Sequence, residues 1–306
     1  MTYAEQVESA TDSDAALRRA RESFAAVFGN GRLSLAELRH NLDTMMLESE
    51  LAEDVSVEEV VVGGVESLRV TAGSDIDDNV LVWFHGGGYV MGSPHGYRHA
   101  AAALSRGLGS AVVLPDYRLA PEHPFPAALD DAATVIDALV SEYGPEHVAV
   151  GGDSAGGGLT VATLVHARDR GAVLPAVAVA VSPLADFTAS GESVATNRDT
   201  DPVITERSLG MLAATYLRGH DRDHPLASPV FADLSALPPI LLLASDSEIL
   251  LDDAVRIDRR VREAGGDSTL SVYADTCHAW TLFTDFLPRA RDGVTEIADF
   301  VRKVLP

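Results

Sequence analysis

The sequence predicts an α/β fold in which helices flank a mostly parallel central sheet of about eight strands. Continuous apolar segments alternate with helical ones, which is typical of parallel strands covered on both faces. Glycine-rich turns follow two of the expected strands, at 85–88 and 151–157. Roughly sixty residues separate the strand that ends near 182 from the next one at 240, too many for one crossover. We therefore expect an inserted helical cap.

Length, charge and cysteine content limit the classes of protein to which this chain can belong. The chain has 306 residues, which we assign to a single domain spanning 1–306. Its formal net charge of −23 argues against nucleic acid or an anionic membrane as a partner. The single cysteine, Cys277, excludes an intrachain disulfide. There is no apolar leader near the start and no apolar stretch long enough to span a membrane, so we expect a cytoplasmic protein.

The elements follow in order along the chain. Residues 1–50 predict two helices, the second capped by Ser34, and the segment 205–217 predicts an amphipathic helix inside the long insertion. Further helices are expected at 97–108, 127–140 and 159–167. The expected strands are 57–62, 67–70, 80–84, 111–114, 147–150, 176–181, 240–244 and 270–273.

The turn at 151–157 is typical of a nucleophile elbow. Ser154 is flanked at two positions on either side by Gly152 and Gly156, between an apolar strand and a helix. Such a reversal lifts the serine above the sheet, and a side chain at either glycine would collide with neighbouring backbone. A plain glycine turn or a phosphate loop is the alternative, but a phosphate loop also needs a lysine, which is absent here.

A second glycine-rich turn, His85-Gly86-Gly87-Gly88, follows the strand 80–84 directly. An elbow serine needs donors for the oxyanion that develops during acyl transfer. We expect these donors to be the backbone amides of Gly87, Gly88 and Ala155, the last being the residue after the nucleophile. A flexible glycine turn is the alternative, and the elbow downstream disfavours it.

A base should follow the serine in the chain order serine, acid, histidine. His166 lies inside the expected elbow helix, where packing is the simpler role. His220 and His224 have the spacing of a metal pair, but their hydrophilic surroundings favour a solvated helix end. His278 lies just past the last strand and is the predicted base.

The acid should follow the strand 240–244. Asp252 and Asp253 are expected in the first turn of the next helix, where carboxylates favour the helix dipole. Asp246 and Glu248 remain, and propensity does not separate them.

These motifs together resemble the bacterial hormone-sensitive-lipase family of α/β-hydrolase esterases, from about residue 57 to the end. The matching segments are His85-Gly86-Gly87-Gly88, Gly152-Asp153-Ser154-Ala155-Gly156, Asp116-Tyr117-Arg118-Leu119-Ala120-Pro121-Glu122 and Leu237-Pro238-Pro239. That family has Asp-Pro-Leu-x-Asp-Glu after the last of these segments, and its first aspartate is the triad acid. Here that position is Glu248, followed by Ile249, so the resemblance favours Glu248 over Asp246.

The resemblance implies a serine carboxylesterase with the triad Ser154, Glu248 and His278, acting on short-to-medium acyl esters without a cofactor or metal. It also implies a cap formed by about 1–50 and 186–222. Tyr89 and Trp280 are candidate pocket walls or core residues.

Other interpretations stay open. A lactonase, amidase or acyltransferase would use the same acyl-enzyme, and a homodimer is compatible with the sequence. Plant gibberellin receptors resemble this family but lack the histidine that is present here, which disfavours a receptor.

Overall fold

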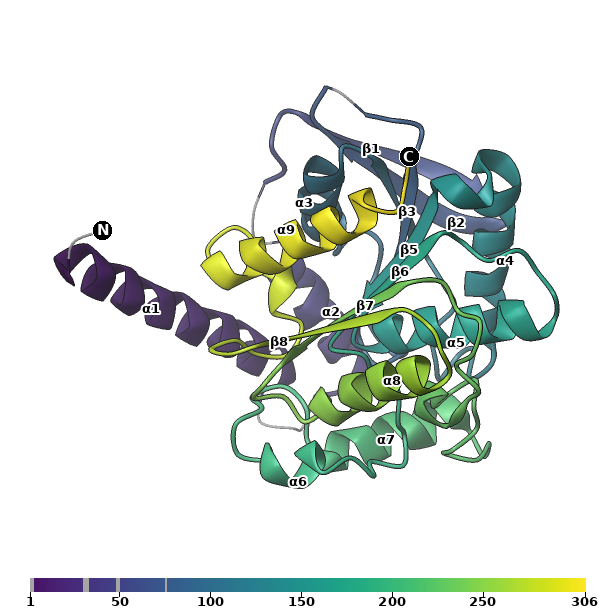
Figure 1. The fold of residues 1–306 in the computed structure, drawn as a ribbon. Coiled ribbons are helices and arrows are strands. Elements are labelled where there is room, and N and C mark those ends of the chain that lie inside the picture. The colour runs from purple at the N-terminus through teal and green to yellow at the C-terminus, as the bar shows by residue number, and fades with distance from the viewer. Residues whose placement is uncertain (1–2, 30–32, 48–49, 75) are drawn as a thin grey trace.

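An eight-stranded sheet forms the centre of the molecule (Figure 1). The structure is a computed structural model that describes residues 3–29, 33–47, 50–74 and 76–306. The strands are β1 (Val55–Val62), β2 (Val65–Ala72), β3 (Val80–Phe84), β4 (Ala111–Pro115), β5 (Val148–Asp153), β6 (Val177–Val181), β7 (Ile240–Ser245) and β8 (Ser268–Tyr273). Their order across the sheet is β1-β2-β4-β3-β5-β6-β7-β8.

The sheet is parallel from β4 to β8 and antiparallel at its other end, where β1 pairs with β2 and β2 pairs with β4. The β1–β2 hairpin turns at Gly63 and Gly64, which have φ values of 58° and 87°. Glycine reaches this left-handed region without steric strain, which explains the two-residue turn. The mostly parallel sheet predicted from the apolar segments is confirmed.

Helices cover both faces of the sheet. On one face lie α3 (Arg98–Leu108) and α9 (Pro288–Arg302); on the other lie α4 (Ala127–Tyr143), α5 (Ala155–Asp169) and α8 (Leu251–Glu263). Along β6, Val179 packs into the core under α3 and α9, while Ala178 and Ala180 pack into the core under α4, α5 and α8. Side chains alternate across a strand, so a central strand with apolar residues at every position fills both cores.

The remaining helices lie near the carboxyl ends of the parallel strands. They are α1 (Tyr3–Phe28), α2 (Leu35–Met46), α6 (Ser193–Thr196) and α7 (Glu206–Leu217), and short 3-10 turns occur at Pro145–His147, Pro229–Phe231 and Trp280–Leu282. Ser34 caps α2 through a capping box with Glu37, as predicted, and Thr205 caps α7. In Figure 1 α1 extends away from the body, while α6 and α7 lie beneath α8. Within the described residues, no helix is long and apolar enough to cross a membrane.

Arg39 attaches α2 to the body of the protein. Its guanidinium donates to the backbone oxygens of Val90 at 2.7 Å and Ala120 at 3.0 Å. The same group forms a bidentate pair with Glu122, at 2.8 and 2.7 Å. The motif at 116–122, which belongs to the family resemblance, therefore anchors the N-terminal helices.

Arg118 in the same motif holds the loop after β4 onto α4. Its backbone N–H and its side chain both donate to the carboxylate of Asp131, at 2.8 to 3.0 Å. The Asp131 side chain is 12% exposed and that of Arg118 is 47% exposed. Partial burial makes this pair stronger than the more exposed pair that Asp137, also on α4, forms with Arg170.

Replacing Asp131 by Asn should lower the free energy of unfolding by about 1 kcal/mol, because the pair loses its charge-assisted bonds. Urea unfolding at neutral pH measures this. The matched control is Asp137→Asn, which removes the exposed pair and should leave the unfolding midpoint nearly unchanged. Equal losses in the two variants would contradict the assigned role.

Candidate active site

The turn between β5 and α5 holds Ser154 in a strained backbone conformation, with φ 55° and ψ −119°. Its N–H donates to the carbonyl oxygen of Val181 on β6 at 2.8 Å, which fixes the turn against the neighbouring strand. A Cβ added at Gly156 would lie 1.9 Å from the carbonyl oxygen of Phe84, and one at Gly152 would lie 2.5 Å from the carbonyl oxygen of Gly156. The predicted need for glycine at both positions is confirmed.

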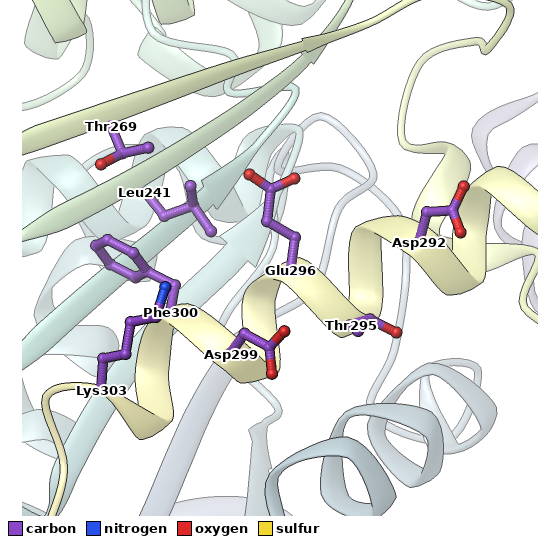
Figure 2. A pocket seen from close by; sticks show the side chains of 8 residues that line it. All are labelled: Leu241, Thr269, Asp292, Thr295, Glu296, Asp299, Phe300 and Lys303. Carbon is purple, nitrogen blue, oxygen red and sulfur yellow. The ribbon is translucent and has the colours of Figure 1, made fainter.

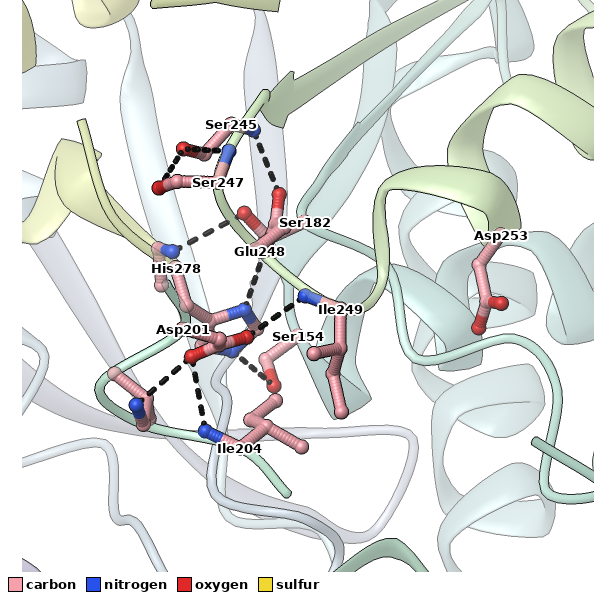
Figure 3. A network of polar contacts seen from close by, with 12 residues as sticks. Ser154, Ser182, Asp201, Ile204, Ser245, Ser247, Glu248, Ile249, Asp253 and His278 are labelled. Carbon is pink, nitrogen blue, oxygen red and sulfur yellow. Dashed lines mark hydrogen bonds and ion pairs between the residues drawn. The ribbon is translucent and has the colours of Figure 1, made fainter. Parts of the chain in front are cut away.

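His278 lies between Ser154 and Glu248 (Figure 3). Its Nε2 is 2.9 Å from the Ser154 hydroxyl, and its Nδ1 is 2.6 Å from a carboxylate oxygen of Glu248. All three are buried, with exposed fractions of 7% for Ser154, 3% for His278 and 0% for Glu248. The backbone N–H of Ala279 donates to the Ser182 hydroxyl at 3.1 Å, which ties the histidine loop to the end of β6.

Of the two candidate acids, the structure brings Glu248 and not Asp246 to the imidazole. The second carboxylate oxygen of Glu248 accepts from the backbone N–H of Ser245 at 2.7 Å. Asp246 is exposed, and its backbone N–H pairs with the carbonyl oxygen of Tyr273. Asp252 and Asp253 lie in the first turn of α8, as predicted.

Negative charge surrounds the His278 imidazole. Burial alone would lower its pKa, but the hydrogen bond and charge of Glu248, together with the charges of Asp201 and Asp153, outweigh burial and raise the pKa of His278. The imidazolium form is therefore stabilised at this position. A serine hydroxyl in contact with such a base can lose its proton during attack on a carbonyl carbon.

The loop after β3 lies beside the serine. Gly87 and Gly88 have φ values of 115° and 63°, which only glycine adopts easily. Their amide groups donate no hydrogen bond to any residue that the structure describes, and the same holds for Ala155. Burial lowers the pKa of His85 to about 4, so this imidazole is neutral, and its Nδ1 donates to the carbonyl oxygen of Gly86 at 2.7 Å.

Asp153 connects the turn at Ser154 to this loop, a role that sequence reasoning missed. It accepts from Trp83 Nε1 at 3.0 Å and from the Tyr97 hydroxyl at 2.8 Å, and that hydroxyl in turn accepts from the N–H of Gly86 at 2.8 Å. Burial raises the pKa of Asp153 to about 6, although both hydrogen bonds oppose the rise. A charged residue at the end of a buried strand was the available signal.

A cavity of about 270 Å³ opens over Ser154. Its walls come from the N-terminal helices, the loop after β3, the segment before and including α7, and the histidine loop. The lining residues are Phe24, Phe28, Leu35, Leu38, Leu42, Gly87, Gly88, Val90, Met91, Tyr97, Asp153, Ser154, Leu184, Val203, Ile204, Ser208, Met211, Leu212, Thr215, His278, Ala279 and Leu282. Most of these side chains are apolar, and among these lining residues none is Lys or Arg.

Tyr89 and Trp280 do not line this cavity and belong to the core. The ring of Tyr89 stacks on Tyr216, with centroids 3.9 Å apart, and Trp280 packs against Tyr273 and donates to the carbonyl oxygen of Arg289. Of the two roles that the sequence left open for these residues, the core role is correct.

A second hollow lies between α9 and the edge strand β8 (Figure 2). Carboxylates of Asp292, Glu296 and Asp299 extend from α9 along it, with Lys303 at one end. Its lining contains neither Ser154 nor His278, so it is separate from the serine site.

The other three histidines weighed from the sequence are also absent from the cavity lining, and His166 lies in α5 as predicted. His220 and His224 lie beyond the end of α7 with their rings edge-on to each other and to Phe125. Nδ1 of His224 also accepts from the backbone N–H of Leu226 at 3.2 Å, so these contacts fit the predicted helix end better than a metal pair.

The sequence of residues 81–282 matches the family described as the α/β hydrolase fold. The chain belongs to this family. This α/β hydrolase is 39% identical over 227 residues to an acetyl-hydrolase of Streptomyces hygroscopicus, covering 74% of this chain and 76% of that one. It is 32% identical over 287 residues to the putative acetyl-hydrolase LipR of Mycobacterium tuberculosis, covering 94% and 92%.

A crystal structure of an esterase from the bacterial hormone-sensitive lipase family superimposes on this α/β hydrolase with a TM-score of 0.92. The two chains are 39% identical, and the match covers 95% of this chain and 98% of that one. The resemblance to hormone-sensitive-lipase-family esterases is confirmed, and the α/β hydrolase is a carboxylic ester hydrolase.

Gly156→Ala should abolish esterase activity and lower the melting temperature, because the added methyl group would overlap the Phe84 carbonyl and push the elbow away from β3. Gly210→Ala is the matched control. Gly210 lies in α7 with nothing within 4 Å of an added Cβ, so this change should raise stability by about 0.5–1 kcal/mol. An active Gly156→Ala enzyme with normal stability would contradict the packing argument.

Proposed function

We propose that the protein is a serine carboxylesterase in which Ser154 is the nucleophile, His278 the general base and Glu248 the acid that orients it. The observation that carries this proposal is the continuous hydrogen-bonded path from the Ser154 hydroxyl through His278 to Glu248, of which Ser154 and His278 line an apolar cavity. Three such groups in contact form the arrangement that acyl transfer requires.

The reaction follows from this geometry. Ser154 Oγ attacks the ester carbonyl carbon while His278 Nε2 takes its proton, and Glu248 stabilises the resulting imidazolium. His278 then donates that proton to the leaving alkoxide as the ester C–O bond breaks. A water molecule, deprotonated by the same nitrogen, attacks the acyl carbon. The bond from that carbon to Ser154 Oγ then breaks and Oγ takes the proton back from His278, which releases the carboxylic acid and free Ser154.

Backbone amides of Gly87, Gly88 and Ala155 are the proposed oxyanion donors. The absence of acceptors for them among the described residues supports this role, as does the position of the loop beside Ser154. One such donor typically contributes about 3–4 kcal/mol of transition-state stabilisation.

We further propose that residues 1–50 and 186–222 form a cap over Ser154 and set the acyl-chain length. Apolar side chains of α1 and α2 meet those of α7 in the cavity wall, including Phe24, Leu38 and Leu212. The cavity volume of about 270 Å³ lies just below the roughly 300–1,000 Å³ usual for ligand pockets, which supports a short-to-medium acyl chain. The cavity lining is mostly apolar and includes no Lys or Arg, which favours uncharged acyl groups.

Related structures are compatible with this substrate class. Solved structures of EstE5, about 36–38% identical to this chain, include one soaked with p-nitrophenyl butyrate and one with PMSF. A homodimer and a cytoplasmic location stay predictions from the sequence.

Ser154→Ala should reduce hydrolysis of p-nitrophenyl esters by at least about a thousandfold for every acyl length, because the nucleophile is lost. In the wild type, kcat/KM should peak among short-to-medium chains and fall when the chain exceeds the cavity. Activity retained by the alanine variant would end the proposed mechanism.

Glu248→Gln should lower kcat by roughly a thousandfold, whereas Asp246→Asn should stay close to wild type. Only neutral His278 acts as a base, so activity rises with pH through the pKa of His278. Since that pKa is raised, the wild-type acidic limb of kcat/KM should lie above the ordinary value of 6.5, and Glu248→Gln should move it to lower pH. The opposite ranking of the two variants would make Asp246 the acid.

A further inference from the structure

Another buried carboxylate, that of Asp201, lies next to the loop that carries Glu248 and is drawn in Figure 3. It belongs to the segment between α6 and α7 and is 8% exposed. One of its oxygens accepts from the backbone N–H groups of Val203 at 2.8 Å and Ile204 at 3.0 Å. The other accepts from the N–H of Ile249, the residue after Glu248, at 2.9 Å.

Neighbouring side chains hold the same loop. The Asn197 amide donates to the carbonyl oxygens of Asp246 and Glu248, both at 2.9 Å. The Thr200 hydroxyl donates to the carbonyl oxygen of Ser247 at 2.9 Å. A single turn of the inserted segment therefore binds the backbone of four consecutive residues, 246–249.

That turn also continues into the substrate cavity. Val203 and Ile204, which donate to Asp201, both contribute to the cavity wall. Asp201 thus joins two parts of the site that lie far apart in sequence, the cavity wall and the loop that carries the acid.

We propose that Asp201 is a positioning residue for the esterase reaction: it fixes the backbone next to Glu248 so that the Glu248 carboxylate meets His278. This inference rests on the proposed function, in which Glu248 is the triad acid. Asp201 does not touch the reacting atoms and acts through Glu248 and through its charge.

The charge adds a second effect. Three carboxylates act on the imidazole of His278: Glu248 from the loop after β7, Asp153 from the end of β5 and Asp201 from the inserted segment. The thiol of the adjacent Cys277 is neutral at ordinary pH, because burial raises its pKa to about 12. Removing the charge of Asp201 therefore lowers the proton affinity of His278 while Glu248 is retained.

Asp186 offers a matched control. It is also a buried carboxylate, 1% exposed, and it accepts from Thr188, Ser190 and Arg256. None of these partners belongs to the acid loop or to the histidine loop. Losing its charge should destabilise the fold without affecting the proposed triad.

The test compares Asp201→Asn with Asp186→Asn. In the first variant, the single oxygen of the new amide is best placed toward the two donors, Val203 and Ile204, which leaves its NH₂ facing the N–H of Ile249. The variant therefore cuts the link to the acid loop and keeps the local turn. We expect kcat for p-nitrophenyl butyrate to fall about tenfold, corresponding to one charge-assisted bond, and the acidic limb of kcat/KM to move to lower pH.

Asp186→Asn should lower the melting temperature at least as much but leave the acidic limb in place. The inference is overturned if Asp201→Asn keeps the wild-type kcat and pH profile, or if Asp186→Asn changes both in the same way. Ser154→Ala is assayed in parallel. An active Ser154→Ala enzyme would refute the proposed function itself. If Ser154→Ala is inactive but the separate variant Asp201→Asn behaves like the wild type, only the role of Asp201 is refuted.

Discussion

The contact of Gly156 with the carbonyl oxygen of Phe84 is the constraint on which the site depends. Phe84 ends β3, and in the parallel register it pairs with Gly152 at the end of β5. The elbow after β5 therefore packs directly on the start of the loop that carries Gly87 and Gly88. Because the two turns touch through backbone atoms, Ser154 and the proposed oxyanion donors hold a fixed relation that does not depend on flexible side chains.

The carboxyl edge of the sheet brings the other groups to the same place. Glu248 follows β7 and His278 follows β8, two neighbouring strands beyond β6. Burying carboxylates around an imidazole is unfavourable unless hydrogen bonds compensate for the lost hydration. The backbone N–H of Ser245 supplies one such bond to Glu248, and that of Ile249 supplies one to Asp201.

The walls of the cavity are held differently from its floor. Apolar packing brings α1, α2 and α7 together above Ser154. Polar contacts anchor these walls: Arg39 of α2 pairs with Glu122, and Asp201, before α7, accepts from the N–H of Ile249. Since apolar packing tolerates volume-conserving changes, the residues of these walls can vary while the floor stays the same. The polar anchors leave less freedom, because each satisfies buried backbone groups.

The sequence alone determined the sheet, the elbow and the histidine loop. The signals for them can be read directly from the chain: apolar segments of strand length, the glycines on either side of Ser154, and the order of the strands. Parallel strands also place their carboxyl ends at the same edge of the sheet, whatever the side-chain packing. Propensity did not separate Glu248 from Asp246, which lie on the same short loop, and only the family resemblance favoured Glu248. The conformation of that loop depends on contacts from residues 197–201. Those contacts join segments that are distant in sequence, and so does the link from Asp153 through Tyr97 to Gly86. The packing of Tyr89 in the core is of the same kind. Only tertiary packing decides which of these groups meet.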